Sequence, residues 1–183
     1  MKKLAVFTAL ALLLGSALFA QTPKAFADRP LRLTSIGQSA DIEMVRVLLA
    51  RAKFDAKSEP LIKASDLNGS AKTLVLVIGG SSKGLGAAGI SAEAEMERAK
   101  ALVAKAKSLG MKIISVHVGG EARRGTLSDG FINYAVPQSD YVIVVSEADK
   151  DGLFTALAGG AKIPLTKVDK IAQVGAPLTG AFK

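Results

Sequence analysis

The sequence predicts an α/β fold: a single, doubly wound, mostly parallel sheet of five to six strands, flavodoxin-like or Rossmann-like. Two observations predict it. Short apolar runs alternate along the chain with amphipathic segments of helical period, as in successive βαβ units. The run at 74–78 is apolar without alternation, which is typical of a parallel strand covered by helices on both faces.

The first 27 residues have the layout of a secretory signal peptide. Lys2 and Lys3 precede an apolar run from Leu4 to Ala20, and Ala25-Phe26-Ala27 has the small-residue pattern of a cleavage site. A membrane anchor is disfavoured because the run is near the lower limit of the ~20 residues needed to span a bilayer. We therefore expect cleavage after Ala27, one domain over residues 28–183, and export to the periplasm or the extracellular space without a membrane anchor.

The composition narrows the class of protein further. The chain has no cysteine, so a disulfide framework and cysteine lipidation are excluded, and a packed core must supply the stability. Its formal charge of +8 is spread along the sequence, with no Trp and only two Tyr for base stacking. We therefore expect no nucleic-acid partner.

Turn and capping residues set the element boundaries. Ser39 and Ser91 can each cap a helix, and Asn68-Gly69 turns the chain. Gly110 stops a helix, and Pro60 places a short strand near the sheet edge because proline cannot donate to a ladder. The predicted strands cover residues 31–36, 61–64, 73–78, 113–118, 141–145 and 163–168. The predicted helices cover residues 42–52, 91–109, 127–135 and 153–158, with a short C-terminal helix from Asp169.

A glycine-rich run from Gly79 to Gly89 directly follows the strand at 73–78. In open α/β sheets ligands bind beyond the carboxyl ends of the strands, where the strand order reverses. If the strand at 31–36 lies beside 73–78, loops 37–41 and 79–89 form that crevice, and the next strand adds residues 117–124. The candidate ligand-binding residues are Gln38, Ser39, Asp41, Gly80, Ser81, Ser82, Lys83, Gly84, Gly86, His117, Arg123 and Arg124.

The glycine run also fits two dehydrogenase patterns, G-x-G-x-x-G over Gly84 to Gly89 and G-x-x-x-G-x-G over Gly80 to Gly86. Both patterns need the glycines to bend directly from strand into helix, whereas the next helix is expected only at Ser91. The first pattern also follows the third predicted strand rather than the first, and the chain has no Tyr-x-x-x-Lys pair. We therefore expect no nicotinamide cofactor.

Two other motifs lead to no catalytic or cofactor assignment. Gly80 to Gly84 fits the G-x-S-x-G nucleophile elbow with Ser82 as nucleophile. The acids between Ser82 and His117 are Glu93, Glu95 and Glu97, all near the start of one helix, so no triad in the usual order can form. A single His without Cys makes no typical zinc site. Thr34 to Ser39 has the spacing of a flavodoxin-type phosphate loop, but few aromatic residues could hold a flavin, and Ser39 more simply caps its helix. We expect no cofactor and no metal.

The chain as a whole resembles an exported bacterial family, domain of unknown function 6305. The segments that carry the resemblance are 33–52, 74–102, 114–132, 141–154 and 163–171, which together cover nearly all of the expected mature chain. The resemblance implies an exported α/β protein and no particular activity or set of catalytic residues.

A binding role is favoured over a catalytic one. We expect an extracytoplasmic ligand-binding or accessory protein that holds a small polar or anionic molecule at the glycine loop. The hydroxyls of Ser81 and Ser82 and the loop amides would donate hydrogen bonds to it. Positive charge would come from three basic residues, Lys83, Arg123 and Arg124.

Three alternatives stay open. A hydrolase or transferase would use Asp41, Glu121 or His117 for proton transfer in the crevice. A protein-interaction module of an envelope complex would use the loops as a docking rim. A purely structural explanation is that the glycines only allow the loop to pack closely on a helix.

Overall fold

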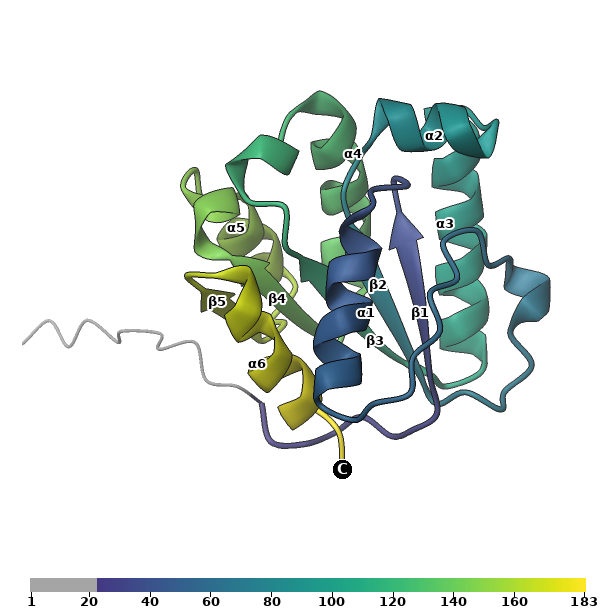
Figure 1. Ribbon diagram of the computed structural model, residues 1–183, viewed down its shortest axis with the longest axis vertical. Helices are drawn as coiled ribbons and strands as arrows, with labels where there is room; N and C mark the ends of the chain where they lie inside the picture. The colour runs from purple at the N-terminus through teal and green to yellow at the C-terminus, as the bar shows by residue number, and fades with distance from the viewer. Residues whose placement is uncertain (1–22) are drawn as a thin grey trace, which may run out of the picture.

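The sheet consists of five parallel strands in the order β1-β2-β3-β4-β5 (Figure 1). The computed structural model describes residues 23–183, so most of the predicted signal peptide lies outside the described residues. The strands are β1 (Leu31–Ile36), β2 (Thr73–Ile78), β3 (Lys112–His117), β4 (Tyr141–Val145) and β5 (Leu165–Val168). The α-helices are α1 (Asp41–Arg51), α2 (Ser82–Ala88), α3 (Ala92–Ser108), α4 (Thr126–Ala135), α5 (Leu153–Gly160) and α6 (Gly175–Gly180).

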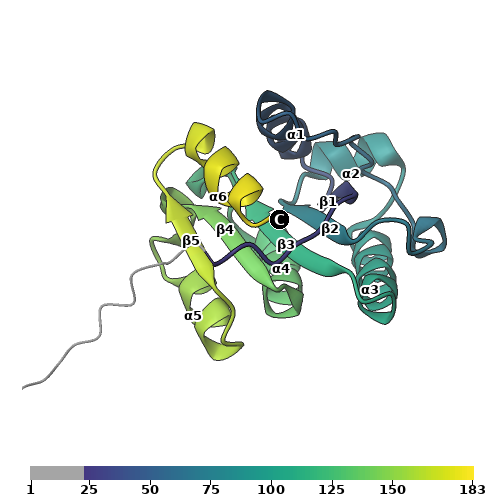
Figure 2. The ribbon, with the colours of Figure 1, turned by 90° about the horizontal axis from the view of Figure 1, so that it is seen from below.

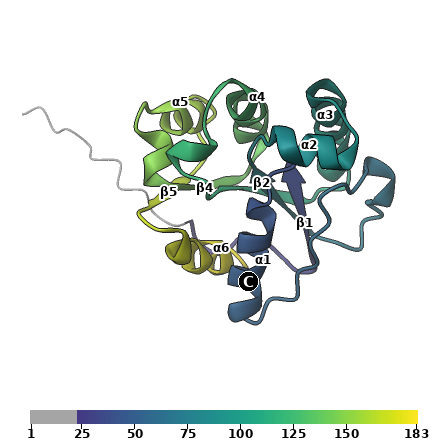
Figure 3. The ribbon, with the colours of Figure 1, turned by 45° about the horizontal axis from the view of Figure 1, so that its top comes forward.

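Helices cover both faces of the sheet, as predicted. α1 and α6 lie on one face, and α3, α4 and α5 lie on the other (Figures 2 and 3). Strand β2 is buried along its whole length and divides its side chains between two hydrophobic clusters. Leu74, Leu76 and Ile78 pack with α3 and α4, whereas Val75 and Val77 pack with α1. The apolar run without alternation thus reflects a strand with two covered faces.

The chain changes direction at β1. The crossovers through α3, α4 and α5 all lie on one face and step the chain away from β1. The segment after α1 runs in the opposite direction across the sheet, to the outer side of β1, where Ser58 forms a parallel bridge with Leu33. Right-handed crossovers in opposite directions put their helices on opposite faces. The order therefore reverses between β1 and β2, where α/β domains place ligands.

Two predicted elements differ in the structure. The strand expected at 61–64 is absent, and a short 3₁₀ helix, η1 (Ala64–Asp66), stands near it. The edge pairing is confined to Ser58 and Glu59, whose N–H donates to the carbonyl of Leu33 at 3.0 Å, and Pro60 ends it. Helix α2 was not expected so soon after β2. It forms because Ser81 Oγ accepts a hydrogen bond from the Gly84 N–H, and Gly89, with φ of 67°, ends it.

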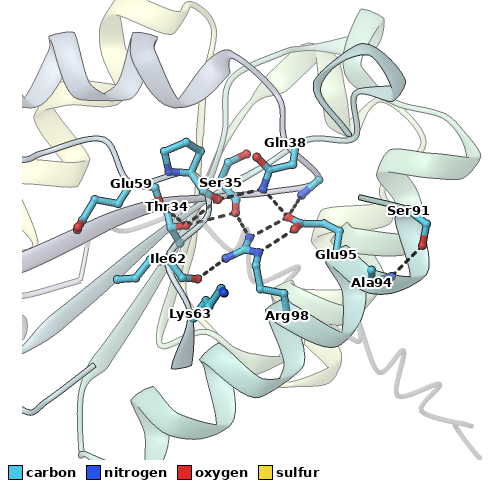
Figure 4. A network of polar contacts seen from close by, with 12 residues as sticks. Thr34, Ser35, Gln38, Glu59, Ile62, Lys63, Ser91, Ala94, Glu95 and Arg98 are labelled. Atoms are coloured by element: carbon cyan, nitrogen blue, oxygen red, sulfur yellow. Dashed lines mark hydrogen bonds and ion pairs between the residues drawn. The ribbon is translucent and has the colours of Figure 1, made fainter. Parts of the chain in front are cut away.

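A buried carboxylate joins α3 to the loop after β1 (Figure 4). The Glu95 side chain is fully buried, and its Oε1 accepts hydrogen bonds from the Gly37 N–H at 2.9 Å and from Gln38 Nε2 at 3.0 Å. Arg98 neutralises it, with Nε 2.7 Å from Glu95 Oε2. The same guanidinium donates to the carbonyls of Ser35 at 2.6 Å and Ile62 at 2.8 Å. The network therefore holds α3, β1 and the edge segment in fixed positions.

Replacing Glu95 with Ala should destabilise the protein by about 3–5 kcal/mol, because it leaves the Arg98 charge and the loop donors without a partner. The matched control is Glu97→Ala on the same helix, whose ion pair with Lys100 has the same spacing but is solvent-exposed. That substitution should cost less than about 1 kcal/mol. Chemical denaturation of the two variants measures both values, and similar losses would contradict the role given to Glu95.

Candidate functional site

The loops that follow β1, β2 and β3 meet at one edge of the sheet, as the sequence predicts. The Ser39 N–H donates to the Gly79 carbonyl at 3.1 Å, and the Ser81 N–H donates to the Gly37 carbonyl at 2.8 Å. Gln38 and Gly80 form an antiparallel bridge. The first two loops are therefore hydrogen-bonded to each other directly.

Close backbone packing accounts for two of the glycines in this run. A Cβ at Gly84 would lie 1.9 Å from the Gln38 carbonyl oxygen, and a Cβ at Gly80 would lie 2.9 Å from the Ser128 backbone nitrogen. The Gly80 N–H donates to Ser128 Oγ at 2.9 Å. Gly86 has no atom near its missing Cβ. The structural explanation of the glycines therefore holds at Gly80 and Gly84.

The β1 loop uses its polar side chains internally. Gln38 has φ of 59°, and its Nε2 donates to the Pro60 carbonyl as well as to Glu95. Ser39 Oγ accepts a hydrogen bond from the Asp41 N–H at 3.2 Å. The N-cap of α1 is Ala40, which has no side-chain cap, so the capping role predicted for Ser39 is wrong by one residue. The side chains of Gln38 and Ser39 are both buried. They shape the loop rather than line an open surface.

Asp41 and Arg123 form an incompletely satisfied pair at the point where the strand order reverses. Asp41 Oδ2 lies 3.4 Å from Arg123 Nε, and within residues 23–183 these are the buried side-chain atoms that have no hydrogen-bond partner. The Asp41 side chain is 3% exposed, whereas the Arg123 side chain is 34% exposed. Arg123 lies against Gly79 and Gly119, where an added Cβ would meet its side-chain carbons at 3.1 Å and 2.2 Å. The arginine thus lies over the ends of β2 and β3, with part of its side chain open to solvent.

His117, the last residue of β3, is buried and interacts electrostatically with Asp41. Its Nδ1 lies 2.9 Å from the Ile78 carbonyl and its Nε2 lies 3.4 Å from the Gly120 carbonyl. A neutral imidazole has one N–H, and the shorter contact indicates that Nδ1 carries it. Burial lowers the pKa of His117, although both carbonyls and the nearby Asp41 carboxylate oppose that shift. The ring is therefore neutral at pH 7 and has no exposed atom for catalysis.

Arg124 does not join Arg123 beside Asp41. Its guanidinium pairs with Asp129 at 2.7 Å and Asp151 at 2.8 Å and also donates to the Ala148 carbonyl. These carboxylates raise the pKa of Arg124, and the arginine in turn lowers the pKa of Asp151 to about 2. No pattern in the sequence indicated Asp129 or Asp151 as site residues, or that they pair with Arg124. This arginine ties the β3 loop to α4 and to the loop before α5.

The remaining predicted residues lie on α2. Ser81 caps the helix, and Ser82, Lys83 and Gly86 are solvent-exposed. Within the described residues the side chains of Ser82 and Lys83 have no hydrogen-bond or ion-pair partner. In the same part of the chain, no group of three or more His, Cys, Asp or Glu residues is arranged to hold a metal ion.

Gly84 and Gly86, two residues apart on α2, should respond oppositely to Ala. Gly84→Ala should destabilise the protein by about 1–3 kcal/mol because the new methyl group collides with the Gln38 carbonyl. Gly86→Ala should stabilise it by up to about 1 kcal/mol because Ala has the higher helix propensity and the space is open. Thermal unfolding measures both effects. A destabilised Gly86→Ala or an unaffected Gly84→Ala would contradict this packing.

Stability should fall as the pH drops below about 6.5, because the unfolded chain then binds a proton at His117 before the folded protein does. The contribution of His117 is complete above that pH and is lost progressively down to the lower pKa of the folded state. Because the chain has one histidine, its imidazole NMR signal reports this pKa without ambiguity. A folded-state pKa at or above 6.5 would contradict the burial of a neutral ring.

Comparison with known proteins gives a family without a described activity. A family profile whose description is domain of unknown function (DUF6305) matches residues 28–182. No curated protein and no solved structure matches the chain. Within residues 23–183 no helix is long and apolar enough to cross a membrane. Since the profile covers the whole sheet and every helix described above, the chain belongs to the DUF6305 family.

Proposed function

We propose that this protein is an exported binding protein that takes a small anionic ligand at the carboxyl edge of the sheet, with Arg123 as its principal cation. The observation that carries the proposal is the Asp41–Arg123 pair. The Nε of Arg123 is buried and, although it faces the Asp41 carboxylate, it has no hydrogen-bond partner. This is unusual in a folded protein, because buried polar groups are normally hydrogen-bonded.

The chemistry of Arg123 suits an anion. Its nearest internal acceptors are Asp41 Oδ2 at 3.4 Å and the Gly80 carbonyl at 3.5 Å, both at the long end of hydrogen-bond range. Because Nε is buried, a carboxylate, phosphate or sulfate would accept its two N–H bonds from the terminal Nη1 and Nη2 groups of the same guanidinium, at shorter distances. The position at the reversal of strand order is the usual ligand position of α/β sheets.

Other residues would have smaller roles. Lys83 is exposed and uncommitted on the adjacent α2, so it can add positive charge at the rim. Ser82 is equally exposed and can donate a hydrogen bond. Arg124 is excluded from direct binding because Asp129 and Asp151 already neutralise it.

A catalytic role has less support. His117 is fully buried, and Glu121 lies in an exposed ion pair 2.5 Å from Lys150. A general acid or base must reach the proton that it transfers. Among the described residues, the exposed apolar side chains Met44, Val47 and Ile171 line a groove on α1 and the 3₁₀ helix η5 (Ile171–Val174). These exposed apolar side chains lie on α1 and η5 and not on the loops after β1, β2 and β3. They therefore do not support the alternative in which those loops dock a protein partner.

Thermal unfolding with phosphate, sulfate and citrate, against chloride at equal ionic strength, tests the proposal. At least one of the three anions should raise the Tm of the wild type in a saturable way, since an occupied site at 100 times its Kd adds about 2.7 kcal/mol. Arg123→Gln should abolish the increase. Arg46→Gln is the matched control, because Arg46 is an ion-paired arginine of similar exposure on α1. A wild type without a saturable increase, or equal losses in both variants, would refute the proposal.

A further inference from the structure

The segment before β1 is part of the folded domain. Ala27 is fully buried in the cluster beneath α1 and α6. Its N–H donates to the Ala181 carbonyl at 2.9 Å, and its own carbonyl accepts from the Lys183 N–H at 3.0 Å. It also forms a parallel bridge with Phe182. The two ends of the described chain are therefore paired side by side below the sheet (Figure 1).

Phe26 extends this pairing. Its N–H also donates to the Ala181 carbonyl, at 2.9 Å. Its ring stands edge-on to Tyr141, a fully buried residue of β4, with the ring centroids 6.3 Å apart. Such an edge-to-face arrangement is a favourable aromatic contact. Phe26 therefore packs at the amino end of β4.

A mature chain that began at Asp28 would lose these contacts. The carbonyl of Ala181, a fully buried residue, would lose both of its donors, and the Lys183 N–H would lose its acceptor. Unpaired buried backbone groups are rare because they are costly. The new α-ammonium would also stand beside an apolar cluster. A leader that ended at Ala27 would thus carry away part of the core.

The sequence contains an earlier position for cleavage. The apolar run ends at Ala20, and Pro23 and Lys24 separate it from Ala27. In signal peptides a small residue at the cleavage point follows the apolar region. Ala20, at the end of the run, supplies the small residue directly before the bond, and the aliphatic Leu18 stands two positions before it, where Ala25 stands in the later pattern.

We propose that a signal peptidase hydrolyses the Ala20–Gln21 bond, so that the mature protein begins at Gln21. It then keeps the buried Ala27 and the partly buried Phe26, which packs against the core. Water adds across the peptide bond and leaves a carboxylate on Ala20 and an α-amine on Gln21. This inference rests on the proposed export and replaces the cleavage after Ala27 that the residue pattern alone suggested.

Expression of the full-length gene in a bacterial host, with intact mass measurement of the exported protein, tests the site. The expected mass is that of a chain starting at Gln21. Ala20→Lys should accumulate as uncleaved precursor, whereas Ala25→Lys, which spoils only the later pattern, should be processed like the wild type. A mass starting at Asp28 would overturn this inference and leave export intact. A wild type that keeps residues 1–20 would instead overturn export, and the processing inference with it.

A second measurement uses Phe26→Ala in the same full-length gene. If Phe26 stays in the mature protein, the exported variant should melt about 3–6 °C below the wild type, because the contact with Tyr141 is lost. The control is Lys24→Ala at a nearby exposed residue, which should leave Tm unchanged. If the leader ended at Ala27, the wild-type and Phe26→Ala products would be chemically identical, so equal melting temperatures would overturn the inference.

Discussion

The buried carboxylate of Glu95 is the interaction on which the geometry of the site depends. A carboxylate without solvent contact needs a counter-charge and several donors, and Glu95 finds them in Arg98, Gly37 and Gln38. Gly37 and Gln38 both have positive φ, and a left-handed backbone costs energy for a residue such as Gln. Glu95 holds that loop in place. Gly84 of α2 packs on the same loop, so the position of the glycine run follows from the network in α3.

The strand order places this local arrangement where open α/β sheets usually bind ligands. With five parallel strands in sequential order, same-handed crossovers would place every connecting helix on one face. The excursion of the chain to Ser58 beyond β1 breaks that rule for α1 alone. The chain therefore leaves β1 and β2 toward opposite faces of the sheet (Figure 2). Arg98 anchors the returning segment through the Ile62 carbonyl. One ion pair therefore stabilises both the reversal and the loop beside it.

Much of the fold could be predicted from the sequence because local residue patterns determine most of its elements. Strands β1, β2 and β4 have the predicted bounds, since each is a short apolar run between clear turn signals. Helix α2 was missed because its glycines have low helix propensity, and its stability comes from the Ser81 cap and from packing on Gln38. The strand expected at 61–64 failed because Pro60 limits the edge pairing to the residues just before it.

The candidate site was predictable in position but not in the roles of its residues. The topology rule brought the three loops together, whereas partners distant in sequence decided which side chains remain available. Arg123 and Arg124 are neighbours with the same chemistry in a sequence, yet Arg124 turns to Asp151 and Arg123 turns to Asp41.

The difference between the two arginines lies in their hydrogen-bond partners. Arg124 gains two carboxylates with well-formed hydrogen bonds and becomes a structural tie between loops. The aliphatic part of Arg123 packs against Gly79 and Gly119, which have no side chain in its way. Its Nε lies 3.4 Å from the buried Asp41 carboxylate, which is too long for a strong hydrogen bond. A guanidinium held in place by packing, with its hydrogen-bonding capacity only partly used, would bind the proposed anion at little entropic cost.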